Sequence, residues 1–257
     1  MKKVQSKTLD RKKFFSDPVL VCTVAFLMIA MLLFVLYPLI YLLIDSVQDE
    51  TTGAFTTAIF KRVLHMTGFQ KAFWNTLRAG IITGVLSTAV GLLFAYVDVY
   101  VRIRSRIVEK LFNLVSVLPV VSPPFVLSLS MILLFGKQGM ITKGLLHIKD
   151  ANIYGLWGLV IVQTMTFFPV CYLMLKGLLK NIDPSLEEAA RDMGASRMKV
   201  FTTVTLPLLL PGLGNAFLVT FIESAADFAN AMLIGGNYDT LAPTIYLQIT
   251  GAYDKQG

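Results

Sequence analysis

The sequence predicts an all-α integral membrane protein with five transmembrane helices. Of its 257 residues, 55% are hydrophobic and 15% are charged, whereas an ordinary soluble domain carries roughly 25% charged residues. The apolar residues also gather into long uncharged runs, and a helix needs about 20 such residues to cross a bilayer. Five runs approach or exceed this length: Val19 to Ile44, Ala79 to Val97, Leu111 to Gly136, Ala151 to Leu175 and Val200 to Ile222.

The positive charges predict how these helices are oriented. Lysine and arginine are retained in the cytoplasmic loops of membrane proteins, and a cytoplasmic N-terminus places 15 of the 23 basic residues inside and 8 outside. We therefore expect a multi-pass membrane protein, with residues 1–17 as a cytoplasmic basic tail and residues 18–257 as the transmembrane domain. The tail either sets the topology alone or also lies along lipid headgroups. The net charge of +7 then needs no nucleic-acid partner.

The first two runs are read as ordinary spans. The first follows a basic stretch but is longer than the roughly 7 to 15 residues of a signal-peptide core, so we expect an uncleaved helix. The second should begin near Trp74 and end near Val101, with Gly80, Gly84 and Gly91 along it. Glycines at such positions let helices approach closely.

The third run contains Pro119, Pro123 and Pro124, so its helix must bend or break. Broken helices are tolerated inside a membrane only where protein or a water-filled cavity surrounds them. Pro123 and Pro124 are therefore candidate residues of a transport pathway, and a kink that only shapes packing is the alternative.

Other chemistry-bearing residues are sparse. Cys22 and Cys171 fall in predicted spans, where they act as small apolar packing residues. His65 and His147 lie in separate loops, so the sequence predicts no metal site and no disulfide. The fourth run, with a helix from about Tyr154 to Leu175, returns the chain to the cytoplasm.

The loop after the fourth span carries clear local signals. Asp183 can cap a helix whose first position is Pro184, a placement that suits the fixed φ and missing N–H of proline. Gly194 can take the left-handed conformation that ends helices. Ser196 offers a second cap, so we expect a short helix, a glycine turn and another helix.

The same loop has a fixed spacing: Glu188-Ala189-Ala190, three residues, Gly194, nine residues, Val204, one residue, then Leu206-Pro207. It resembles the cytoplasmic loop motif of type I permeases of binding-protein-dependent ABC importers, with valine in place of isoleucine at one position. The resemblance implies that residues 181–207 form the coupling loop, which docks into the ATPase. Glu188, Ala189, Ala190 and Gly194 would transmit its stroke, with Leu206 and Pro207 completing the motif. The alternative is a loop that only connects two spans.

The resemblance also implies a location in the bacterial inner membrane and a set of partners. These are an ABC ATPase subunit dimer, a second permease domain, fused or separate, and a periplasmic or extracellular substrate-binding protein. The chain has no glycine-rich nucleotide loop of the G-x-x-x-x-G-K-[ST] type, so we expect no enzyme activity and no cofactor in it, and ATP bound by the partner. Permeases of this type have one more helix after the fifth span, so the chain is expected to lack the last helix of the domain.

Glu223 and Asp227 lie four residues apart in the region of the fifth span, which puts them on one face of a continuous helix. Acids in a span usually face a cavity or a partner, so they are candidate pathway residues for a cationic cargo. Pairing with Arg78 or other donors on a neighbouring helix is the alternative.

Several segments are similar to the first half of ferric-iron importer permeases. They are Glu223 to Phe228, Leu233 to Asn237, Ile245 to Gly251, Pro123 to Val126 and Leu134 to Gly139. Ferric iron is therefore the expected cargo, with polyamine, thiamine, sulfate or phosphonate as alternatives. An ion-coupled secondary transporter, in which Glu223 and Asp227 bind the coupling proton, is the alternative of another class.

Overall fold

The computed structural model describes residues 17–48, 54–101, 104–148 and 152–251. The chain forms two compact units, Met1–Met66 and Thr67–Gly257, each described by itself. Within the described residues all regular elements are helices. Apart from Asp17, the basic tail predicted for residues 1–17 lies outside the described part of the chain. So do Arg102, Lys149 and Lys255, which are counted in the charge argument.

The first unit contains the first span. Asp17 caps α2 (Pro18–Met31) by accepting hydrogen bonds from the amides of Val19 and Leu20. A π-helical turn, η1 (Leu32–Leu36), then leads into α3 (Tyr37–Asp45), and Pro38 stands in the first turn of α3. Proline cannot donate to the preceding turn and its ring crowds the carbonyl four residues earlier, which explains the local widening at this point. A short helix, α4 (Ala58–His65), ends the unit.

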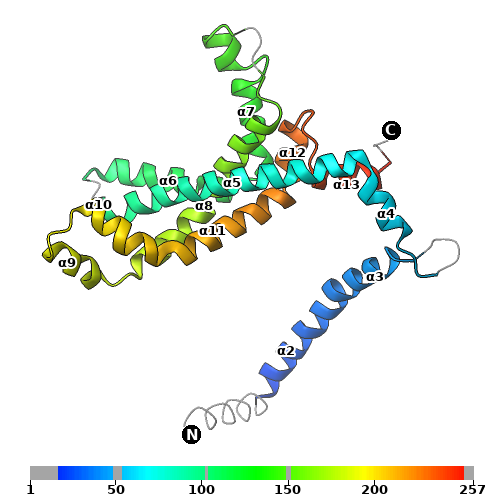
Figure 1. Ribbon diagram of the computed structural model, residues 1–257, viewed down its shortest axis with the longest axis horizontal. Helices are drawn as coiled ribbons and strands as arrows, with labels where there is room; N and C mark the ends of the chain where they lie inside the picture. Colours follow the sequence, from blue (N-terminus) through cyan, green and yellow to red (C-terminus); the bar gives the residue numbers. More distant parts are fainter. Residues whose placement is uncertain (1–16, 49–53, 102–103, 149–151, 252–257) are drawn as a thin grey trace. The chain divides into compact units, whose positions relative to one another are not determined.

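Three long helices form the centre of the second unit: α5 (Thr67–Tyr100), α8 (Leu156–Lys180) and α11 (Leu206–Ala226). They pack against one another, with α5 and α11 both lying along α8 (Figure 1). The buried core includes Ala95, Tyr172, Leu175 and Leu209. The second span is thus longer than predicted, because the helix starts at Thr67 rather than near Trp74.

The predicted third span is divided into two helices. α6 (Arg106–Val121) ends before Ser122 and Pro123, whose backbones are extended, and α7 (Pro124–Phe135) starts anew. The break that the prolines predict is confirmed, although Pro119 is accommodated inside α6. The span itself is shifted: the stretch long and apolar enough to cross a membrane is Phe125–Leu145, which includes the π-helical turn η2 (Met140–Leu145), rather than Leu111 to Gly136. The described residues contain five such stretches, as predicted.

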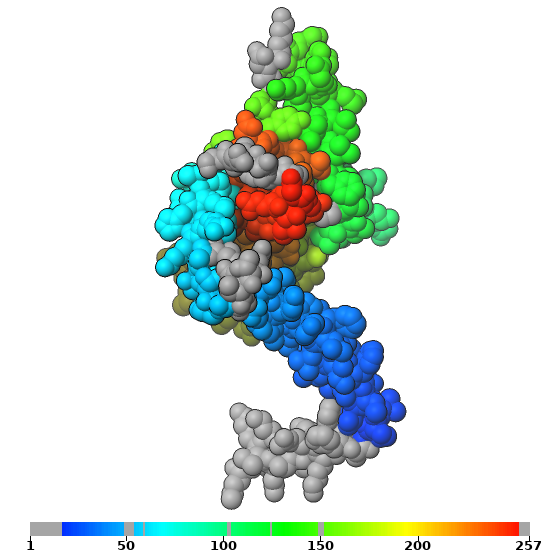
Figure 2. All heavy atoms as spheres, turned by 90° about the vertical axis from the view of Figure 1, so that its right-hand side faces the viewer, coloured from blue at the N-terminus to red at the C-terminus, as the bar shows by residue number. Residues whose placement is uncertain are grey.

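After α11 the chain continues through α12 (Ala229–Ile234) and α13 (Leu241–Ile249). Figure 2 shows α13, in red, beside the cyan beginning of α5. Two hydrogen bonds hold the intervening segment there: Asn75 donates its side-chain amide to the carbonyl of Asp239 at 2.9 Å, and the amide of Leu241 donates to the hydroxyl of Thr76 at 2.8 Å. α5 and α8 run in the same direction and α11 runs opposite to both. This unit therefore has two ends, one with the start of α5 and the other with Tyr100, Lys180 and the loop that follows.

Candidate functional site

The loop of residues 181–207 forms the helices that its sequence predicts. Asp183 accepts a hydrogen bond from the amide of Ser185 at 3.0 Å and so caps α9 (Pro184–Asp192). The same bond lowers the pKa of the exposed Asp183 carboxyl, because it favours the charged form. Pro184 occupies the first turn, as expected.

The turn after α9 depends on glycine. Gly194 has φ +84°, in the left-handed region, and the amide of Ala195 donates to the carbonyl of Ala190 at 3.1 Å. No atom lies within 4 Å of the place where a Cβ at 194 would stand, so the requirement is conformational rather than steric. The predicted glycine turn is confirmed.

The second cap is also confirmed. Ser196 accepts a hydrogen bond from the amide of Lys199 at 3.4 Å, which opens α10 (Arg197–Val200). A π-helical turn, η3 (Phe201–Thr205), then joins α10 to α11, whose first turn holds Leu206 and Pro207. The loop therefore runs without interruption into the fifth span.

The motif residues divide between an outer and an inner face. Glu188, Ala189 and Gly194 are exposed, while Ala190 is buried. At the start of α11, Leu206 is half-buried and Pro207 is exposed. Three large apolar side chains of the loop are also exposed, Leu186 at 48%, Met193 at 83% and Met198 at 71%. The loop thus presents small and apolar side chains outward.

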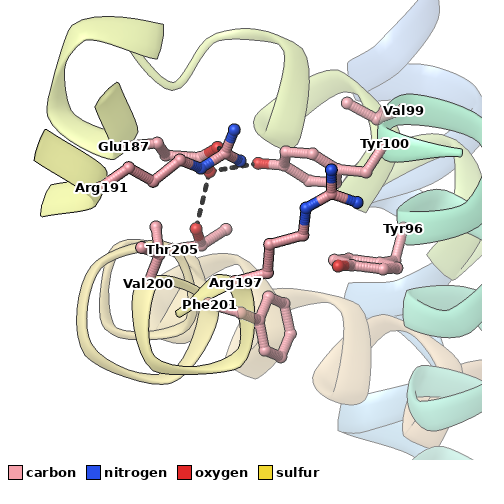
Figure 3. A pocket seen from close by; sticks show the side chains of 9 residues that line it. All are labelled: Tyr96, Val99, Tyr100, Glu187, Arg191, Arg197, Val200, Phe201 and Thr205. Carbon is pink, nitrogen blue, oxygen red and sulfur yellow. Dashed lines mark hydrogen bonds and ion pairs between the residues drawn. The ribbon is translucent and has the colours of Figure 1, made fainter. Parts of the chain in front are cut away.

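The inner face is held by a residue that the sequence did not single out. Glu187 is buried, and its Oε1 accepts hydrogen bonds from the hydroxyl of Tyr100 at 2.5 Å and of Thr205 at 2.7 Å (Figure 3). Its other oxygen lies 3.8 Å from the guanidinium of Arg191, one turn further along α9. No local signal marks Glu187, because the two hydroxyls that donate to it come from the end of α5 and from η3.

A cavity of about 260 Å³ adjoins this contact. Figure 3 shows Arg197 reaching into it between Tyr96 and Tyr100. Its lining consists of Tyr96, Val99, Tyr100, Glu187, Arg191, Arg197, Val200, Phe201 and Thr205. Among the residues that the structure describes, Arg197 has no ion-pair partner.

A second polar cluster joins α5 to α8 at the same end. Lys176 lies 2.5 Å from Asp98, and the buried Tyr172 donates its hydroxyl to Asp98 at 2.9 Å. The nitrogen of Lys176 is 3.0 Å from the Tyr172 hydroxyl. Asp98 and Lys176 each directly follow an uncharged run, so the sequence predicts that both lie near helix ends. It does not indicate that they pair with each other.

A third cluster lies toward the opposite end. Gln163 of α8 is fully buried, and its amide nitrogen donates to Asp227 at 2.8 Å. Its oxygen accepts from the hydroxyls of Ser224 at 2.7 Å and Thr83 at 3.1 Å. Asp227 also accepts from the amide of Asn230 at 3.1 Å. The cluster holds the point where the chain leaves α11 and enters α12.

The expectation that Glu223 and Asp227 both lie within the helix of the fifth span is wrong. α11 ends at Ala226, and Asp227 has an extended backbone, so the regular spacing stops between the two acids. Glu223 is exposed, with no partner among the described residues, whereas Asp227 is bound by Gln163 rather than by Arg78. Their role in a pathway stays a prediction.

The other candidate residues are placed as follows. Pro123 is exposed at the break between α6 and α7, and Pro124 starts α7. Cys171 is buried in the core, while Cys22 is exposed in the first unit, so its packing role stays a prediction. Within the described ranges, no three histidine, cysteine, aspartate or glutamate side chains gather to hold a metal ion.

The chain is similar in sequence to known transport permeases. The ferric transport system permease protein FbpB of Actinobacillus pleuropneumoniae is 36% identical over 223 residues, which cover 85% of this chain and 32% of that protein. The putative ferric transport system permease protein FbpB 1 of Haemophilus influenzae is 32% identical over 240 residues, covering 92% and 37%. The chain thus spans about a third of the length of these relatives.

A solved structure shares the fold. The bacterial ABC transporter involved in the import of the acidic polysaccharide alginate has a chain that matches with a TM-score of 0.76 at 19% identity, covering 94% of this chain and 87% of that one. At the sequence level, residues 87–253 match the family described as the inner membrane component of binding-protein-dependent transport systems. This match takes in the loop of residues 181–207 and more than half of the chain. The chain therefore belongs to the family of binding-protein-dependent transport system inner membrane components.

Proposed function

We propose that the protein containing this chain is the permease of an ATP-driven importer for ferric iron. The identity to two ferric transport permeases over most of the chain carries this proposal. The chain supplies spans of the pathway, and a separate ABC ATPase dimer hydrolyses ATP. A second permease domain, fused or separate, and a periplasmic binding protein complete the assembly, with the N-terminus cytoplasmic.

The loop of residues 181–207 is the proposed ATPase contact. Its outward face offers small side chains at Ala189 and Gly194 and exposed apolar ones at Leu186, Met193 and Met198. A patch of exposed apolar side chains is more often an interaction site than a surface that faces only water. On this reading Glu188, Ala189, Ala190 and Gly194 transmit the stroke, and Leu206 and Pro207 pass it into the fifth span.

Uptake by cells tests the cargo. Cells in which the gene is disrupted and then restored are given radiolabelled ferric ion, and parallel cultures receive labelled sulfate or a polyamine. Ferric uptake that disappears on disruption and returns on restoration supports the proposal. Loss confined to sulfate or polyamine uptake would instead assign that cargo.

ATP dependence separates the importer from an ion-coupled transporter. Membrane vesicles with the restored protein are energised either by ATP or by a proton gradient alone. We expect ferric uptake only with ATP, and purification of an ATPase together with the chain. Uptake driven by the gradient without ATP contradicts the importer.

A further inference from the structure

The contact of Glu187 with Tyr100 and Thr205 gives the loop an attachment that the chain path does not supply. Through the backbone, residues 181–207 join only α8 and α11. Tyr100 is the last residue of α5, 87 positions before Glu187. The hydrogen bond from Tyr100 therefore links α9 directly to a third long helix, which itself packs along both α8 and α11.

We propose that Glu187 is a positioning residue that clamps α9 to α5 and to η3, so that movement of α9 is passed to α5. The Glu187 clamp consists of Glu187, Tyr100 and Thr205. This inference rests on the proposed function of the loop as the ATPase contact. It assigns transmission to a buried residue beside the motif, in addition to the exposed motif residues.

The chemistry of the contact favours a stiff attachment. Glu187 is 9% exposed, and a buried carboxylate is costly unless hydrogen bonds satisfy it. Both hydroxyls donate to the same oxygen, at 2.5 and 2.7 Å, the short range typical of hydroxyl-to-carboxylate bonds. Arg191 contributes less, because it is about half exposed and 3.8 Å away.

The place of Thr205 adds to the argument. Thr205 is buried and is the last residue of the π-helical turn η3. π-helical turns inside longer helices occur frequently at functional sites. Through Thr205 the clamp contacts the fifth span where π-helical geometry changes to α-helical geometry, and through Tyr100 it contacts the end of α5.

The clamp can be weakened one hydroxyl at a time. Tyr100→Phe and Thr205→Val each remove a donor and keep the side-chain shape. A hydrogen bond to a charged group is worth roughly a ten- to hundredfold change in an equilibrium. The matched controls are Tyr96→Phe and Thr203→Val. The ring of Tyr96 contacts that of Tyr100 in a tilted arrangement, and Thr203 is exposed and bonds only to the carbonyl of Lys199, four residues earlier.

The first experiment measures the attachment itself and needs no ATPase. Nitroxide labels are placed on cysteines at Ser185 of α9 and Leu93 of α5, both exposed, in a full-length protein with Cys22→Ser; Cys171 is buried. Pulsed electron resonance then gives the distribution of label distances. We expect it to broaden in both clamp variants and to stay as in the parent protein in both controls. An unchanged distribution in the clamp variants overturns the clamp.

The second experiment measures transmission. The full-length protein is reconstituted with its ATPase and binding protein, and ferric uptake and ATP hydrolysis are measured together. We expect Tyr100→Phe and Thr205→Val to keep hydrolysis within about twofold of wild type while ferric ions carried per ATP fall about tenfold. A loss of protein stability alone would lower hydrolysis and uptake in proportion. Unchanged uptake per ATP in both variants refutes the transmission role.

The two experiments also separate this inference from the proposed function. Were the wild-type protein to bind no ATPase, the importer would be wrong and the transmission role with it, and the label distances would still decide whether the attachment exists. If the wild type and the clamp variants all carry the same number of ferric ions per ATP, the importer is supported and the transmission role of the clamp is refuted. Glu187→Gln keeps an acceptor oxygen, so it should retain more coupling than Glu187→Ala.

Discussion

Replacing Gly91 with alanine should destabilise the protein by separating α5 from α8. A Cβ at position 91 would stand 2.5 Å from the Cβ of Cys171 and 2.8 Å from the amide nitrogen of Tyr172. Ordinary contacts begin near 3.4 Å, so the two helices would have to move apart by about 1 Å over their closest approach, in an interior that is close-packed.

The structure sets the size and sign of the effect. Overpacking of this kind costs about 1–3 kcal/mol, while exchanging glycine for alanine in a helix gains up to about 1 kcal/mol. The clashing atoms are backbone and Cβ atoms, which cannot rotate away, so the cost lies in the upper part of its range. We expect Gly91→Ala to lower the free energy of unfolding by about 1–2 kcal/mol.

Two other glycines provide the comparison. Gly177 of α8 has no atom within 4 Å of a Cβ, so Gly177→Ala should keep the helix-propensity gain and raise the stability. Gly84→Ala should fall between, because its Cβ would meet the ring edge of Phe217 at 2.9 Å and a side chain can turn aside. Thermal unfolding of the full-length protein in detergent, followed by circular dichroism, gives the order. A Gly91→Ala protein as stable as Gly177→Ala would refute this account of the helix contact.

Three further predictions concern the loop, the acids and the topology. Gly194→Ala should reduce ATP-driven uptake while the protein still inserts, because alanine at φ +84° costs roughly 1–2 kcal/mol; normal uptake per ATP in this variant would remove the need for the turn. Asp227→Asn should lower the unfolding temperature in detergent, because it disturbs bonds from a buried glutamine, whereas Glu223→Gln should leave it unchanged; ferric uptake in the same variants tests the pathway role. Cysteines at Ser196 and Asn237 should react with an impermeant thiol reagent from opposite sides of the membrane, the one at Asn237 from outside. Labelling of both cysteines from the same side would contradict the topology.

Local signals in the sequence were sufficient for the loop. Asp183, Pro184, Gly194 and Ser196 act within four residues of their own positions, through capping and backbone preference. Their effects depend little on the rest of the fold, so the helix, turn and helix could be predicted. The length of uncharged runs likewise predicted five spans, since crossing a bilayer is a requirement on composition.

Contacts between distant segments could not be predicted in the same way. The sequence near Glu187 does not indicate its role, because its partner Tyr100 lies 87 positions away in the chain. The spacing of Glu223 and Asp227 predicts a shared face only on a continuous helix, but the helix ends at Ala226, and Gln163 binds Asp227 just beyond that end. In both cases the deciding partner is a polar residue on another helix, far away in the sequence.

Contacts at both ends of α5 connect the loop of residues 181–207 to the segment between α12 and α13. At the loop end, α5 is held by Tyr100 through Glu187 and by Asp98 through Lys176. At the other end, Asn75 and Thr76 hold the segment between α12 and α13. Between these points Gly91 brings α5 against the backbone of α8, and a close-packed contact transmits displacement instead of absorbing it. Under the clamp proposal, a stroke on α9 is therefore passed to α5 and, through these contacts, to α8 and to the segment between α12 and α13.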